Sequence, residues 1–277
     1  MFYSEMIGLI KSTAWEMMPR SLFGAFHLTY VLIGFVVCLY MAILLRNTSE
    51  HSEKIMFFVI GVCLLISEIY KQLFWYYAIG YDEYPWIRLP FHLCSIPMYL
   101  LLVLPFIKNG KVKTALYDFL GTYSFVGGLI SVVFDGGLLR EYWTMTIHCL
   151  NWHLTLVFIG LYLSLRTKIS REFKGFVGAS IVYYVFAVAA FCLNCALWNV
   201  SNGTCDMFFV GPAPMEVVVF RDIAKVTGRP IITLIYLLTL TFIAFVFWFL
   251  LSILIRQKAV DRKSDGNNKI TDDKHIN

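Results

Sequence analysis

The hydrophobic and polar positions along this chain form seven long apolar stretches separated by short polar segments. A helix that crosses the hydrocarbon of a bilayer needs about 20 apolar residues, and each stretch is close to that length. None of them alternates between apolar and polar positions as membrane strands do. The pattern predicts an all-α polytopic membrane protein with seven transmembrane helices, at Leu22–Leu45, Ile55–Ala78, Leu89–Ile107, Thr114–Phe134, Tyr142–Leu165, Phe176–Trp198 and Pro230–Ile255.

The two ends of the chain differ from this central part. Residues 1–21 place Glu5, Lys11 and Glu16 among apolar side chains, which is typical of an amphipathic segment lying on the membrane surface. Residues 256–277 are polar and charged, and we expect them to form a disordered cytoplasmic tail. The predicted organisation is therefore an interfacial segment, a membrane domain over residues 22–255, and a tail.

Composition agrees with a membrane environment, because 59% of the residues are hydrophobic and only 15% are charged. We expect membrane lipids as partners, no nucleic acid, and the cell membrane as the location. Basic residues gather in the loops after the first, third and fifth stretches and in the tail, which places the N-terminus outside and the C-terminus in the cytoplasm. The basic residues of these loops are Arg46, Lys54, Lys108, Lys111, Lys113, Arg166, Lys168, Arg171 and Lys174.

The chain has seven cysteines, and only Cys205 falls in a predicted external loop. A cysteine buried in a span behaves as a small hydrophobic residue, so a structural disulfide is not expected. No spacing of Cys and His matches a zinc site, and the sequence predicts neither a metal nor another cofactor.

Polar and ionisable side chains inside the predicted spans gather in the outer half of the membrane, where each of them needs a partner or a function. Glu68 and Lys71 lie three residues apart on one helix face. His92 and Cys94 lie between Pro90 and Pro97, which loosen the helix. The remaining candidates are His27 in the first span and the stripe Thr144, His148, Asn151 and Thr155 in the fifth.

Each candidate also has a purely structural interpretation. Glu68 and Lys71 can neutralise each other between helices, and a membrane histidine often bonds a neighbouring helix. His153 lies about 140° around its helix from His148, so the two rings need not face one cavity. The external run Asn202-Gly203-Thr204-Cys205-Asp206 can fold back over the opening, where Asn202 and Asp206 are candidate ligand contacts.

Several of these segments resemble the bacterial YwaF family of integral membrane proteins, in the same order along the chain. That family is distantly similar to the animal transmembrane-protein-164 acyltransferases, which remodel ether phospholipids through a catalytic Cys close to a His. The matching segments are Phe23–Leu28, Ser67–Lys71, Leu89–Ser95, His153 with Gly160–Leu163, and Asn202–Phe208. The family loop usually reads Gly-Thr-Asn-Tyr, whereas this chain has Cys205 and Asp206 at the last two places.

The resemblance implies that Cys94 is an acyl-accepting nucleophile, and a nearby base or cation is what such a thiol requires. His92, His148 and His153 are the candidate bases, and His27, Glu68, Lys71 and Asn151 are candidate substrate contacts. On a regular helix His92 and Cys94 would point about 160° apart, so His92 serves only if this turn is irregular.

The sequence predicts a phospholipid acyltransferase or acyl hydrolase working through a Cys thioester in an outer-leaflet cavity. The alternative is a non-catalytic lipid- or small-molecule-binding protein that uses the same cavity as a transporter, receptor or accessory subunit. No internal inverted repeat supports a carrier, and the chain lacks a large cytoplasmic domain that would signal alone.

Overall fold

The computed structural model describes residues 2–17, 21–80 and 83–272, and the regular secondary structure there is helical apart from one isolated bridge between Glu16 and Tyr142. The all-α prediction is confirmed. The α-helices are α1 Phe2–Ser12, α2 Ala25–Leu45, α3 Glu50–Phe74, α4 Ile96–Val103, α5 Lys111–Phe119, α6 Phe125–Phe134, α7 Trp143–Leu165, α8 Phe173–Ala196, α9 Val218–Thr227 and α10 Arg229–Asp272.

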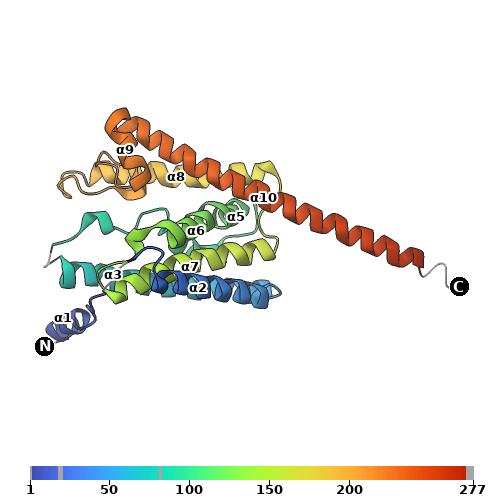
Figure 1. Cartoon of the computed structure of the whole chain (residues 1–277), viewed down its shortest axis with the longest axis horizontal. Coiled ribbons are helices and arrows are strands. Elements are labelled where there is room, and N and C mark those ends of the chain that lie inside the picture. Colours follow the sequence, from blue (N-terminus) through green and yellow to red (C-terminus); the bar gives the residue numbers. More distant parts are fainter. Residues whose placement is uncertain (1, 18–20, 81–82, 273–277) are drawn as a thin grey trace.

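The central element of the bundle is α7, which packs against α2, α3 and α6 (Figure 1). The apolar windows of α7 and of the continuous helix Lys111–Phe134 are 61% and 72% buried, against 17% for α2 and α10. The centre is thus α7 with α5 and α6, and the outer helices expose apolar faces as lipid requires. We call the end of the bundle that carries α1 and α9 the α1 end, and the opposite end the far end.

Five helices of the described chain are long and apolar enough to cross a membrane: Ala25–Leu45, Lys111–Phe134, Trp143–Leu165, Phe173–Ala196 and Arg229–Ile253. Helix α3 is long enough but carries Glu50, Glu53, Glu68 and Lys71, which lower its apolar character. The membrane character of the protein is confirmed, and the count of seven spans remains a prediction.

The third predicted span, Leu89–Ile107, is only partly helical. Helix α4 begins at Ile96 and is followed by the 3-10 turn Leu104–Phe106, so the apolar helical segment covers Ile96–Phe106. Pro90 cannot donate a backbone hydrogen bond and restricts the residue before it, while Pro97 occupies the first helical turn. The prolines therefore leave residues 89–95 as turns rather than as helix.

The ends of the chain also differ in part from expectation. Helix α1 packs Ile10 against Phe74 and Met145, so it contacts the bundle, whereas residues 18–20 lie outside the described part. Residues 256–272 continue α10, although we expected them to be disordered. Adding residues to an existing helix avoids the cost of nucleation, and this segment contains no proline. Residues 273–277 lie outside the described residues.

Candidate functional site

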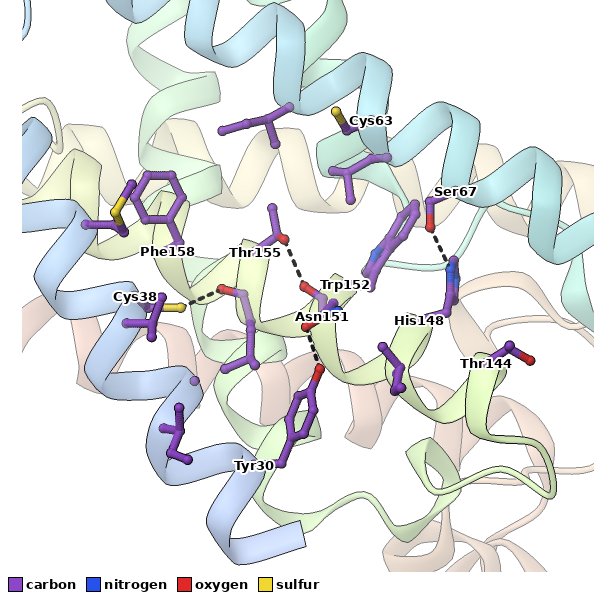
Figure 2. A pocket seen from close by; sticks show the side chains of 18 of the residues that line it. Tyr30, Cys38, Cys63, Ser67, Thr144, His148, Asn151, Trp152, Thr155 and Phe158 are labelled. Atoms are coloured by element: carbon purple, nitrogen blue, oxygen red, sulfur yellow. Dashed lines mark hydrogen bonds between the residues drawn. The ribbon is translucent and has the colours of Figure 1, made fainter. Parts of the chain in front are cut away.

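A groove of about 1400 Å³ lies between α2, α3 and α7 (Figure 2). Because α7 packs against both α2 and α3, it joins two helices that do not pack closely on each other. Residues Ile33 and Val37 of α2 line the groove and are more than half exposed. The groove is therefore open sideways, toward the hydrocarbon of the bilayer. Its volume exceeds the range of about 300–1000 Å³ that is usual for small-molecule pockets.

The polar stripe predicted on the fifth span lines this groove, which confirms that its members share one face. Thr144, His148, Asn151 and Thr155 are all lining residues. Two of them, His148 and Asn151, meet polar groups from the two facing helices, as Figure 2 shows. The Ser67 hydroxyl is 2.7 Å from His148 Nδ1, and the Tyr30 hydroxyl donates to Asn151 Oδ1 at 2.9 Å.

The groove is polar toward the α1 end and apolar toward the far end. Ser67, His148 and Asn151 lie on the half nearer α1, whereas Met41, Ile60 and Phe158 lie beyond them. A bilayer lipid has the same distribution of polarity, with a polar head and ester region followed by apolar chains. The groove is therefore matched in size and polarity to a lipid rather than to a compact soluble ligand.

The predicted ion pair between Glu68 and Lys71 is confirmed, with Lys71 Nζ 2.7 Å from Glu68 Oε1. Glu68 is only 3% exposed and also accepts a hydrogen bond of 2.6 Å from Gln72 Nε2. Gln72 in turn bonds the Arg88 carbonyl and the Tyr84 hydroxyl. The pair therefore belongs to a hydrogen-bond network that ties α3 to the segment before α4, and neither member lines the groove.

His92 and Cys94 lie in the turn that precedes α4, so the irregular geometry required for His92 is present. His92 Nε2 bonds the Ile87 carbonyl at 3.0 Å, while its buried Nδ1 has no hydrogen-bond partner in the described chain. Cys94 is half-buried behind the groove, and Trp152 Nε1 donates to its backbone carbonyl at 2.8 Å. Trp152 lines the groove and therefore separates it from Cys94.

Lys71 lies at the centre of the predicted catalytic residues. Its ammonium interacts electrostatically with His92 and Cys94 of the turn before α4 and with His148 and His153 of α7. The convergence of these residues on one site stays a prediction. The groups that act on the Cys94 thiol are Lys71, Glu68, Cys149 and Ser95, and no histidine of the described chain is among them.

Two predicted histidines bond backbone carbonyls outside the groove. Both ring nitrogens of His27 are used, because Nε2 is 2.9 Å from the Val132 carbonyl and Nδ1 accepts from the Phe23 amide at 3.3 Å. His153 is buried, and its Nδ1 bonds the Cys149 carbonyl one turn earlier. Neither ring lines the groove, so the position of His27 gives no support to a role in substrate binding.

The loop that carries Asn202 and Asp206 packs on α8 and α10, and none of its residues lines the groove, so it does not cover the groove as we expected. The two predicted ligand contacts have structural positions. Asn202 is exposed in a turn with a positive φ of 50°. Asp206 is fully buried and pairs with Arg229 at 2.7 Å and with the Gly211 amide at 2.6 Å. Burial raises the pKa of the Asp206 carboxyl to about 6, while the Arg229 guanidinium acts in the opposite direction. Asp206 therefore holds this loop against the start of α10.

The loop also carries backbone strain that the sequence did not indicate. Phe208 and Phe209 have φ values of 58° and 55°, a left-handed region that costs non-glycine residues about 1–3 kcal/mol each. Phe208 is 1% exposed, and the Phe209 ring lies 5.2 Å from the His92 ring. The strained segment therefore packs directly on the turn that carries Cys94.

Sequence analysis also missed a buried charge cluster at the far end. Glu53 is 3% exposed, forms an ion pair with Arg166 Nε at 2.7 Å, and accepts hydrogen bonds of 3.1 Å from the hydroxyls of Tyr117 and Tyr162. The predicted second span begins at Ile55, so Glu53 counted as a loop residue. An earlier helix start was indicated by Ser49, which caps α3 by accepting from the Ser52 amide.

The fold and the groove define an integral membrane protein of helices with a lipid-facing site. A sequence model described as the TMEM164 family matches residues 22–252, so the chain belongs to this family. No curated protein and no solved structure matches the chain. The predicted likeness to transmembrane-protein-164 is thus confirmed at the level of the family, and the bacterial YwaF assignment stays a prediction.

Proposed function

We propose that this protein is a membrane enzyme that transfers or hydrolyses acyl groups of phospholipids through a thioester on Cys94. The observation that carries the proposal is the hydrogen bond from Trp152, a groove residue, to the backbone of Cys94. Cys94 is therefore the neighbour of a residue that lines a groove of lipid size, and a displacement of the Trp152 ring would bring bound lipid closer to Cys94.

The chemistry at Cys94 needs a thiolate and an acceptor for its proton. Burial of the Cys94 thiol opposes ionisation, and the Lys71 ammonium acts against this effect by charge attraction. His92 supplies a buried, unpartnered Nδ1 two residues away, with His148 and His153 as the other candidate bases. The thiolate sulfur adds to the ester carbonyl, and the C–O bond to the alcohol breaks. The alcohol leaves with the proton, and the acyl thioester remains.

The experiment that tests this proposal uses purified protein in lipid nanodiscs with a phospholipid labelled in its acyl chain. We expect the label on Cys94 by peptide mass spectrometry and its loss in Cys94→Ser, since a hydroxyl lacks the acidity of a thiol. Cys192→Ser, on the exposed face of α8, is the matched control and should keep the label. Equal turnover by Cys94→Ser and the wild type would exclude the covalent mechanism.

The second candidate is a non-catalytic lipid-binding protein, and one observation favours it. Cys94 does not line the groove, so a bound lipid need not approach the thiol. On this alternative a photoactivatable lipid crosslinks to groove residues such as Asn151, and no label ever reaches Cys94. The same labelled nanodiscs therefore discriminate between the two functions.

The proposal includes seven membrane spans, with the α1 end outside and α10 leading into the cytoplasm of a cell membrane. Basic residues of the far end, such as Lys113, Arg166 and Lys168, support this orientation. A cysteine introduced at Gly136 should react with an impermeant reagent added outside, and one at Asn109 should not. The reverse pattern would overturn the orientation.

A further inference from the structure

The groove contains its own pair of a hydroxyl and an imidazole. Ser67 of α3 and His148 of α7 both line it, and Ser67 Oγ lies 2.7 Å from His148 Nδ1. This distance lies within the 2.6–3.2 Å range expected between a nucleophile and its general base. The two residues come from different helices and are 81 positions apart, so their meeting is a product of the fold.

A hydrogen-bond donor for a carbonyl oxygen lies beside this pair. Asn151 follows His148 by three residues, which puts both on one face of α7 with Cβ atoms about 5–6 Å apart. The Tyr30 hydroxyl donates to Asn151 Oδ1, and this bond orients the amide. The Asn151 amide nitrogen then has no other partner among the described residues, and the side chain is exposed in the groove.

The surroundings also distinguish this pair from a bond that only joins two helices. An unpaired amide facing hydrocarbon is unfavourable, yet the groove keeps Asn151, His148 and Ser67 together at its polar end. The Trp152 ring packs on the His148 ring at 5.5 Å and limits its rotation. The base is therefore held in place in a site that is open to lipid.

We infer that Ser67 and His148 form a second nucleophilic centre, which hydrolyses acyl esters bound in the groove. The inference goes beyond the thioester chemistry proposed for Cys94, which lies on the other side of Trp152. Its substrate class is a long-chain carboxylic ester, whose chain occupies the apolar part of the groove near Phe158 and Met41. The Asn151 amide donates to the carbonyl oxygen as negative charge develops there.

The reaction has two steps. His148 Nδ1 takes the Ser67 proton as the hydroxyl oxygen adds to the ester carbonyl carbon. The C–O bond to the alcohol then breaks, and the alcohol leaves with that proton, so an acyl-serine remains. In the second step His148 takes a proton from a water molecule as the water oxygen adds to the acyl carbonyl carbon. The C–O bond to Ser67 then breaks, His148 returns the proton to the Ser67 oxygen, and the carboxylic acid is released.

A fluorophosphonate with a long alkyl chain tests the inference, because it phosphonylates activated serines. In nanodiscs we expect the wild-type label on the Ser67 peptide, none on this peptide in Ser67→Ala, and at least about tenfold slower labelling in His148→Gln. Ser164→Ala should label like the wild type, since the Ser164 side chain bonds the Gly160 carbonyl and does not line the groove. The rate of 4-nitrophenyl palmitate hydrolysis should likewise fall in Ser67→Ala and His148→Gln and stay at the wild-type value in Ser164→Ala.

A second variant separates loss of the nucleophile from loss of the fold. Cys63 lines the same groove and has no histidine partner among the described residues, so it is an internal standard for the reactivity of a groove thiol. In Ser67→Cys, alkylation by a chain-bearing iodoacetamide should be at least about tenfold faster at the introduced thiol than at Cys63. His148→Gln should remove this difference. Equal rates at the two thiols, or unchanged serine labelling in Ser67→Ala, would overturn the inference, whatever the outcome at Cys94.

Discussion

Replacing Lys71 with Met removes one member of the buried ion pair and leaves Glu68 charged at membrane depth. The two charged atoms are 2.7 Å apart, and the Glu68 side chain is 4% exposed. Removing one partner of a buried pair typically costs about 3–5 kcal/mol. Gln72 still donates to Glu68, and the Lys71 side chain is 16% exposed. We therefore expect a loss of about 2–3 kcal/mol from the free energy of unfolding.

The double variant Glu68→Gln with Lys71→Met removes the uncompensated charge. Replacing a whole buried pair by neutral groups is often nearly neutral, so its loss should be about 1 kcal/mol. Since about 1.4 kcal/mol is a tenfold change in an equilibrium constant, the single variant should unfold about tenfold more readily than the double one.

Reversible unfolding in mixed micelles of dodecyl maltoside and dodecyl sulfate, followed by tryptophan fluorescence, measures these differences. The matched control is Lys225→Met, which breaks an ion pair of the same spacing and length whose side chains are both 71% exposed. That change should have no measurable effect. If Lys71→Met is as stable as the wild type, or more stable than the double variant, water solvates the pair and the reasoning fails.

Three further predictions concern the loop before α10 and the far end. Phe209 has a φ of 55°, which glycine adopts more easily than alanine, so Phe209→Gly should be more stable than Phe209→Ala by about 1 kcal/mol in thermal unfolding. If the alanine variant is the more stable of the two, the backbone at this position is not strained. Asp206→Ala should accelerate hydrogen exchange within residues 199–217 but not in α7, because the contacts to Arg229 and Gly211 are lost; a uniform change would contradict a local role. Glu53→Gln should lower the free energy of unfolding by about 3 kcal/mol in the same micelles, and a silent change would show that the ion pair with Arg166 adds nothing to stability.

Features that depend on residues near one another in sequence could be predicted. The starts and ends of α2, α7 and α8 follow the apolar pattern to within a few residues. The α7 stripe and the Glu68–Lys71 pair follow from helical spacing alone. Each of these predictions required only that a regular helix forms.

Features that depend on packing between distant segments could not be predicted. Ser67 reads as an ordinary polar residue of a span, and only the approach of α3 to α7 gives it a histidine partner. Asp206 reads as a loop residue until Arg229 meets it. Trp152 reads as an apolar filler, and its position between the groove and Cys94 follows from the crossing of α7 past the turn before α4. The short α4 was signalled by two prolines, but length alone favoured a full span.

The sideways opening between α2 and α3 determines how any ligand concentration should be expressed. A molecule that reaches Asn151 past Ile33 and Val37 arrives from the bilayer, so its effective concentration is a mole fraction among lipids and not a bulk molarity. Diluting it with inert lipid at constant total amount should lower occupancy, whereas adding buffer should not. Detergent tails partition into the same opening and compete, so kinetic constants measured in micelles will depend on the detergent-to-protein ratio.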